Sequence, residues 1–68
     1  MARFEQYEIY ALDAGAWGLA SAFRDFDLAS SVARSRSTRV RLMHVVYEDS
    51  QVVEKQVIAD IGATREHP

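Results

Sequence analysis

Residues 40–48 read VRLMHVVYE, and this segment most limits how the chain can fold. Its apolar side chains alternate with the two-residue period of a strand, and they occupy both faces of it. One face holds Val40, Leu42, His44 and Val46, and the other holds Arg41, Met43, Val45 and Tyr47. An antiparallel strand with a solvated face carries polar residues there, so we expect this strand near the middle of a sheet.

The N-terminal third predicts a hairpin. Residues 4–12, FEQYEIYAL, are rich in aromatic and β-branched residues, as strands are. Both of its faces are apolar, with Tyr7, Ile9 and Ala11 on one and Tyr10 and Leu12 on the other. Residues 13–16 supply a turn with a glycine, and residues 17–24, WGLASAFR, follow as the second strand. On that strand we expect one face to hold Trp17, Leu19, Ser21 and Phe23.

The pattern changes from strand to helix at residues 25–27, DFD. Either Asp25 or Asp27 is suited to cap a helix N-terminus. Apolar residues then recur at spacings of one, three and four, which predicts an amphipathic helix of about three turns. Its apolar stripe comprises Leu28, Ala29, Val32 and Ala33. Arg34 and Arg36 near the end of the helix complement its dipole.

Residues 52–61, VVEKQVIADI, allow two interpretations. The EKQVIADI part contains good helix formers. The β-branched content and the short polar turn at residues 49–51 favour a strand that forms a hairpin with residues 40–48. On that strand we expect one face to hold Val53, Val57, Ala59 and Ile61.

These elements predict a single α+β domain over residues 1–62, in the order strand, strand, helix, strand, strand (ββαββ). Each hairpin reverses the chain, and the apolar first and third strands belong in the centre. We therefore expect a four-stranded antiparallel sheet in the order 2-1-3-4, with the one helix packed on one face. Residues 63–68 are polar and predict a disordered C-terminal tail.

The size and composition of the chain narrow its function. A domain of 68 residues is marginal as a monomer, because it buries only about 60% of its unfolded surface. There is no cysteine, and the two histidines show no ligand spacing, so neither a disulfide nor a metal or other cofactor is expected. The net charge of −2 gives no overall attraction to nucleic acid or acidic lipid. The N-terminus has no signal-peptide core and no apolar run is long enough to span a membrane, so a cytoplasmic location is expected.

The predicted helix is too small for the predicted sheet. A helix of about 11 residues is about 16 Å long, whereas the sheet measures roughly 19 by 26 Å. We therefore expect an exposed apolar sheet face that joins two copies in a symmetric homodimer, and a non-enzymatic protein-interaction function. The expected interface residues are Tyr10, Leu12, Met43, Val45 and Tyr47. The alternative is that loops and long side chains cover this face.

Arginines supply a second hypothesis. Four of them stand within residues 34–41, namely Arg34, Arg36, Arg39 and Arg41, and such a cluster is suited to bind phosphates. Together with stacking tyrosines it indicates nucleic-acid binding as the alternative function. The simpler interpretation is a solvated helix end and strand start, in which the arginines offset acidic residues. The negative net charge and the lack of an aromatic RNA-binding motif favour that simpler interpretation.

His44 supplies the third and least favoured hypothesis, a ligand pocket or an enzymatic site at a dimer seam. A general base needs an orienting carboxylate, and Glu48 on the same strand face is too far away. A core or interface histidine is the simpler interpretation. Trp17 directly follows the first turn and is interpreted as a hairpin anchor or a lid on the sheet rather than as a ligand platform.

The runs YEIYAL, WGLASAFRDFD and VRLMHVVYE together resemble a class of short, uncharacterised bacterial proteins. Members of that class combine an aromatic hairpin, an Asp-started, Ala-rich helix and a Val-rich hairpin. The resemblance extends over residues 4–61. It implies a free-standing small protein rather than a fragment of an enzyme, and it implies no catalytic or binding residue.

Overall fold

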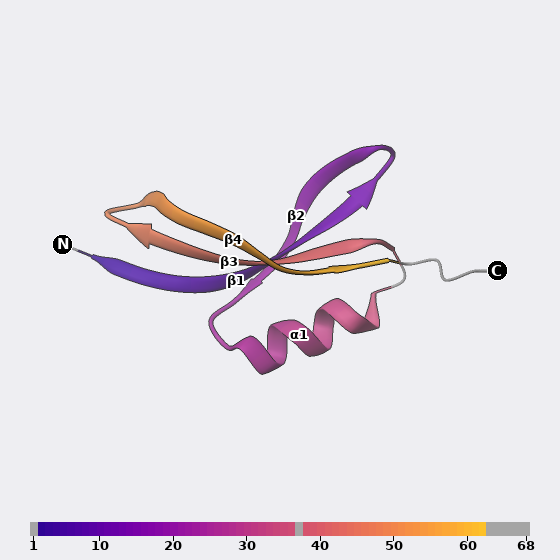
Figure 1. The fold of residues 1–68 in the computed structure, drawn as a ribbon, viewed down its shortest axis with the longest axis horizontal. Helices are drawn as coiled ribbons and strands as arrows, with labels where there is room; N and C mark the ends of the chain where they lie inside the picture. The colour runs from indigo at the N-terminus through magenta and orange to yellow at the C-terminus, as the bar shows by residue number, and fades with distance from the viewer. Residues whose placement is uncertain (1, 37, 63–68) are drawn as a thin grey trace.

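A computed structural model describes residues 2–36 and 38–62. The chain forms the elements β1 (Arg3–Asp13), β2 (Ala16–Phe23), α1 (Phe26–Ser35), β3 (Val40–Glu48) and β4 (Gln51–Ile61). The predicted ββαββ order is confirmed, and β4 is a strand and not a helix. Figure 1 shows α1 lying against one side of the twisted sheet. The predicted tail, residues 63–68, lies outside the described residues.

The four strands form one antiparallel sheet in the order β2-β1-β3-β4, as predicted from the apolar character of the first and third strands. Tyr7 in the centre of β1 lies between Phe23 of β2 and His44 of β3. Val45 of β3 lies between Gln6 and Lys55 in the same way. Strands that are apolar on both faces therefore occupy the centre, where both faces are most easily covered.

Two-residue turns join the strands of each hairpin. Ala14 and Gly15 have φ angles of 53° and 82°, and Asp49 and Ser50 have φ angles of 52° and 70°. Positive φ at both central residues is the type I′ geometry, whose twist matches that of the flanking strands. Only Gly15 among these four adopts the conformation without a steric cost from a Cβ atom. The turns fix the pairing that the strands then propagate.

An extra residue in β2 corrects the predicted face of that strand. Ile9 pairs with Ser21 but Tyr10 pairs with Leu19, so Ala20 has no partner in β1. This β-bulge shifts the alternation by one residue. Ser21 therefore lies on the helix side with Ile9, whereas Leu19 lies on the opposite face with Tyr10. The predicted shared face was therefore wrong for the set Trp17, Leu19, Ser21 and Phe23. The sequence did not reveal the bulge, because an inserted residue leaves the composition of a strand unchanged.

Two irregularities in β4 correct a second prediction. Leu42 pairs with Ala59 and Met43 pairs with Val57, so Ile58 is unpaired, and a similar shift leaves Val53 unpaired. Ala59 and Ile61 pack against the core under α1. Val57 lies on the opposite face, beside Met43. The four residues Val53, Val57, Ala59 and Ile61 thus do not share one face, since two bulges separate them.

Local signals define the helix. Asp25 is the N-cap, and its side chain accepts a hydrogen bond of 3.0 Å from the backbone N–H of Leu28. Ala29 and Ala33 are fully buried, as the periodicity predicted. Leu28 departs from the predicted stripe, because its side chain is 50% exposed. The buried face of α1 is therefore narrow and made mostly of alanine, which lets the helix lie close to the sheet.

The core forms where α1 meets the two central strands. It comprises Ile9, Ala29, Ala33, Val40 and Leu42, each at most 2% exposed. The helix contacts β1, β2 and β3. Its ten residues span about 15 Å, whereas the eleven residues of β1 or β4 span about 36 Å. The β3–β4 turn and the start of β1 consequently extend well past the helix (Figure 1).

No helix among residues 2–36 and 38–62 is long and apolar enough to cross a membrane.

Replacing Ile9, which has no exposed surface, tests this assignment of the core. We expect Ile9→Ala to lower the free energy of unfolding by about 2–5 kcal/mol, because the cavity cannot collapse between a helix and a sheet. Leu28→Ala, at a half-exposed helix position, is the matched control and should change it by less than about 0.5 kcal/mol. Urea unfolding at one fixed protein concentration measures both, and equal losses would place Ile9 outside the core.

Candidate functional site

The face of the sheet opposite α1, called here the helix-free face, contains all five predicted interface residues. Register places Tyr10, Leu12, Met43, Val45 and Tyr47 there, because Ile9 and Leu42 between them point to the core. Their exposure differs, however. Val45 has no exposed surface, and the other four are half-buried. The chain's own side chains therefore cover much of the surface that the sequence predicted to be open.

A buried carboxylate lies at the centre of this face. Glu8 is 1% exposed and accepts three hydrogen bonds. The Tyr10 hydroxyl donates to Oε1 at 2.7 Å, and Gln6 Nε2 donates to Oε2 at 2.8 Å. The Tyr47 hydroxyl donates to Oε2 from the neighbouring strand β3. Together these donors stabilise a charge that would otherwise be costly to bury.

The hydrogen bonds change the acidity of all three ionisable groups. Burial raises the pKa of Glu8, but hydrogen bonds from Tyr47, Gln6 and Tyr10 outweigh it and hold this pKa below the ordinary 4.5. The hydrogen bond to Glu8 raises the pKa of Tyr10 to about 12, with burial adding to the effect. The same hydrogen bond raises the pKa of Tyr47. Glu8 is thus an anion and both phenols are donors at neutral pH, an arrangement suited to fixing side chains rather than to moving protons.

Sequence reasoning missed the Glu8 cluster. The sequence pattern predicted no role for Glu8. A local signal existed, since Tyr10 and Gln6 stand two residues away on the same strand face. The third partner, Tyr47, is 39 residues away in the sequence and becomes a neighbour only through the pairing of β1 with β3.

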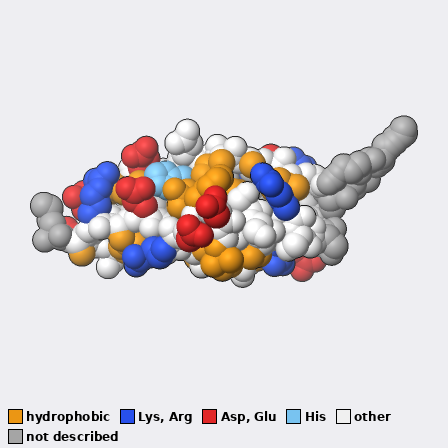
Figure 2. Space-filling view, turned by 90° about the horizontal axis from the view of Figure 1, so that it is seen from below, with side chains coloured by type: hydrophobic (Ala, Val, Ile, Leu, Met, Phe, Trp, Pro, Cys, Tyr) orange, Lys and Arg blue, Asp and Glu red, His pale blue; other side chains and the backbone are white. Residues whose placement is uncertain are grey.

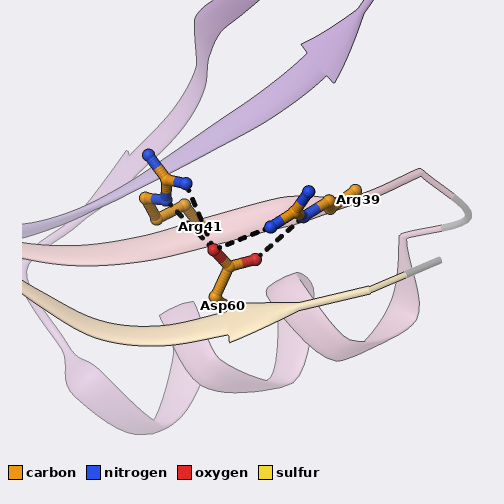
Figure 3. A network of polar contacts seen from close by, with 3 residues as sticks. All are labelled: Arg39, Arg41 and Asp60. Atoms are coloured by element: carbon orange, nitrogen blue, oxygen red, sulfur yellow. Dashed lines mark hydrogen bonds and ion pairs between the residues drawn. The ribbon is translucent and has the colours of Figure 1, made fainter.

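Two of the four predicted arginines converge on one carboxylate (Figure 3). Arg39 Nε lies 3.0 Å from Asp60 Oδ1, and Arg41 Nη2 lies 3.2 Å from Asp60 Oδ2. Hydrogen bonding from Arg39 lowers the pKa of Asp60 below its ordinary value. The Arg41 guanidinium also lies over the Trp17 ring, 4.3 Å from its centroid. The Trp17 ring is thus partly covered by an arginine side chain and remains 36% exposed.

The other two arginines belong to different surroundings. Arg34 lies exposed in the last turn of α1, and Arg36 is the C-cap residue. Arg36 borders an open pocket of about 570 Å³, whose other lining residues are Ala11, Asp13, Ala16, Trp17, Gly18, Leu19, Ala20 and Thr38. The predicted cluster is thus divided between an ion pair on the helix-free face and two exposed side chains near the helix end.

His44 has a carboxylate partner that the sequence did not reveal. Its Nε2 lies 2.7 Å from Glu5 Oε1 on the adjacent strand β1, whereas sequence reasoning considered only Glu48. The His44 ring also lies against Tyr7, with centroids 5.2 Å apart, and Phe26 meets Tyr7 edge-on. Tyr7 and His44, both half-buried, thereby join the sheet to Phe26 at the start of α1.

Exposed apolar side chains gather away from these polar clusters. Eight large hydrophobic residues among the described ones are 36–58% exposed. Six of them lie on the two outer strands, namely Trp17 and Leu19 on β2 and Val52, Val53, Val57 and Ile58 on β4. Phe26 and Leu28 add apolar surface on the helix side, where hydrophobic side chains gather at mid-length with acidic ones around them (Figure 2). The apolar surface available to a partner on the sheet therefore lies along its two outer strands and not at its centre.

No group of three metal-ligating side chains lies together within the described part of the chain. Comparisons with protein-family models, with curated proteins and with solved structures gave no match to this chain.

Removing the Tyr47 hydroxyl tests whether the Glu8 cluster stabilises the fold. We expect Tyr47→Phe to cost about 1.5–3 kcal/mol of unfolding free energy, because a hydrogen bond to a buried charge is lost. Tyr7→Phe is the control, since it removes a hydroxyl that makes no hydrogen bond to Glu8. Thermal or urea unfolding of the two variants measures the difference, and equal stabilities would contradict the assignment.

Acid should weaken the Glu8 contribution in a defined direction. Because the pKa of Glu8 is lower in the folded chain than its ordinary 4.5, its contribution is complete above that pH and is lost as the pH falls through the folded value. The stability difference between the native chain and Glu8→Gln should therefore shrink as the pH is lowered from 6 towards about 2. Urea unfolding across this range provides the measurement, and a difference that stays constant or grows would reverse the assigned direction of the pKa.

Proposed function

We propose that this chain is a non-enzymatic protein-interaction module that acts as a homodimer through apolar side chains that its own helix leaves uncovered. One observation carries the proposal. Among the described residues, eight large hydrophobic side chains are at least one-third exposed. Only seven hydrophobic residues are buried, and two of these are alanines. Exposed apolar surface of this extent on a small domain is typical of interaction sites.

Energetics favour association with a partner. Each large aliphatic or aromatic side chain gains about 1.5–3 kcal/mol when it is fully removed from water. The core of this small domain is limited to the region under α1, and there is no cysteine to supply a disulfide. A second copy is the simplest partner, since closed twofold dimers are the commonest oligomers.

The polar clusters support a non-catalytic role. Glu8 receives its hydrogen bonds from side chains of the chain itself, and Asp60 is held by two guanidinium groups. Neither cluster presents a carboxylate that awaits a substrate. The cytoplasm remains the proposed location, because a small domain without cysteines is typical of a reducing compartment.

Nucleic-acid binding is the second candidate, and one observation favours it. Arg39 and Arg41 both lie over the ring of Trp17, and Arg36 borders the same pocket as Trp17. Two arginines over a partly exposed aromatic ring, with a third arginine beside the adjoining pocket, resemble a single-strand binding platform. Asp60 neutralises part of their charge, so we rank this function below self-association. Salt-sensitive binding of a single-stranded oligonucleotide that is lost when these three arginines become Gln would reverse the ranking.

Light scattering over a concentration series tests self-association. We expect the molar mass to rise from one chain to two with increasing concentration. The double variant Leu19→Ser with Val57→Ser should raise the dissociation constant by at least about tenfold, because it removes exposed apolar side chains from both outer strands. A mass of one chain at high micromolar concentration would exclude the proposed function.

A further inference from the structure

We infer that two copies pair along the outer edge of β2, so that their sheets join into one continuous eight-stranded antiparallel sheet. This inference rests on the proposed homodimer and identifies the surface that makes it. The partner is a second copy of this chain, and the contact is between backbone edges rather than between sheet faces.

β2 lacks the features that keep an edge strand from pairing. Its outer edge has no strand beside it in the sheet order. Residues 14–23 contain no Asp, Glu, Lys, Arg, His or Pro, and this is the longest uncharged run in the sequence. Leu19 on this strand is 58% exposed, the highest value among the large hydrophobic residues described. An uncharged, apolar edge strand is a template for another strand.

β4, the other outer strand, is protected in two ways. It carries Glu54, Lys55 and Asp60, and bulges at Val53 and Ile58 interrupt its ladder. Charges and bulges are the devices by which proteins block edge pairing. The two edges therefore differ in their capacity to pair.

The Ala20 bulge determines which register matches the two faces. Two residues that lie opposite each other in antiparallel strands point to the same face of the sheet. In a regular twofold pair of identical strands, the numbers of two such residues are therefore both odd or both even, and their sum is even. The extra residue in each copy of β2 changes this requirement to an odd sum. A sum of 39 pairs β2 over its whole length, with the twofold axis between Leu19 and Ala20.

At three of its four distinct pairs, this register sets a large side chain opposite a small one. Its opposed residues are Trp17 and Ala22, Leu19 and Ala20, Gly18 and Ser21, and Ala16 and Phe23, each pair occurring twice. Size alternation of this kind lets side chains of two copies interlock without clashes. β2 is thus complementary to itself along its whole length.

Charge complementarity favours the same arrangement. Arg24 of one copy lies opposite Gly15 in the turn of the other, two residues from Asp13, so opposite charges approach at both ends of the pair. This approach of Arg24 and Asp13 adds an attraction between the two copies at each end of the paired strands.

Two lysine variants on the helix-free face separate the possible dimers. Leu19→Lys places a charge on β2, and Val57→Lys places one on β4 at a similarly exposed position, 58% and 49% respectively. In light scattering we expect Leu19→Lys to raise the dissociation constant at least about tenfold and Val57→Lys to change it less than about threefold. Circular dichroism confirms that both variants are folded. A dimer weakened by Val57→Lys, alone or equally with Leu19→Lys, overturns the β2 edge and leaves the homodimer intact, whereas a monomeric native chain overturns both.

Cross-linking tests the register without relying on a disruptive change. The chain has no cysteine, so cysteines introduced at Gly18 and Ser21 are the only thiols in their variants. A Cβ atom at Gly18 meets nothing within 4 Å. We expect an equimolar mixture of Gly18→Cys and Ser21→Cys to form a mixed disulfide dimer under mild oxidation, and either variant alone to form much less. A native dimer whose mixture gives no more disulfide than the single variants excludes this register.

Discussion

The fold depends on the close approach of α1 to the two central strands, and alanine makes that approach possible. Ala29 and Ala33 present no bulk beyond a methyl group, so Ile9 and Leu42 fill the space between helix and sheet. This contact is short, because only ten residues are helical. The parts of the strands that extend beyond the helix must be stabilised by strand pairing and by side chains that lie across the sheet surface. The polar clusters lie where the helix does not cover the sheet.

Long polar side chains replace a second layer on the helix-free face. Tyr10 and Tyr47 cover the centre of the sheet with their rings and direct their hydroxyl groups to Glu8, so that a buried charge organises an aromatic cover. Arg41 lies across Trp17 in a comparable way and is itself held by Asp60. These covers explain why Val45 is inaccessible although no helix lies above it. They also move the remaining apolar surface to the two outer strands.

Sequence patterns were sufficient for the element order and for the sheet order, because both depend on which strands are apolar on two faces. They were insufficient wherever one residue is inserted into a ladder. The bulge at Ala20 reverses the faces of everything after it in β2, and Ala20 looks no different from Ala22 in composition. Contacts across strands were also hidden, since Glu5 meets His44 and Glu8 meets Tyr47 only once the register of β1 on β3 is known. The sequence showed the cluster of four arginines, but it did not show that Asp60 binds two of them, Arg39 and Arg41.

The contrast between the two outer strands has a consequence for how far such a chain can assemble. A sheet with two receptive edges can add copies without limit and grow into a fibre. Here only one edge is uncharged, while the other carries Glu54, Lys55 and two bulges. Any sheet extended through β2 therefore ends in β4 on both sides, and growth terminates. In such an assembly the charges and bulges of β4 would stop further copies from adding and so oppose aggregation.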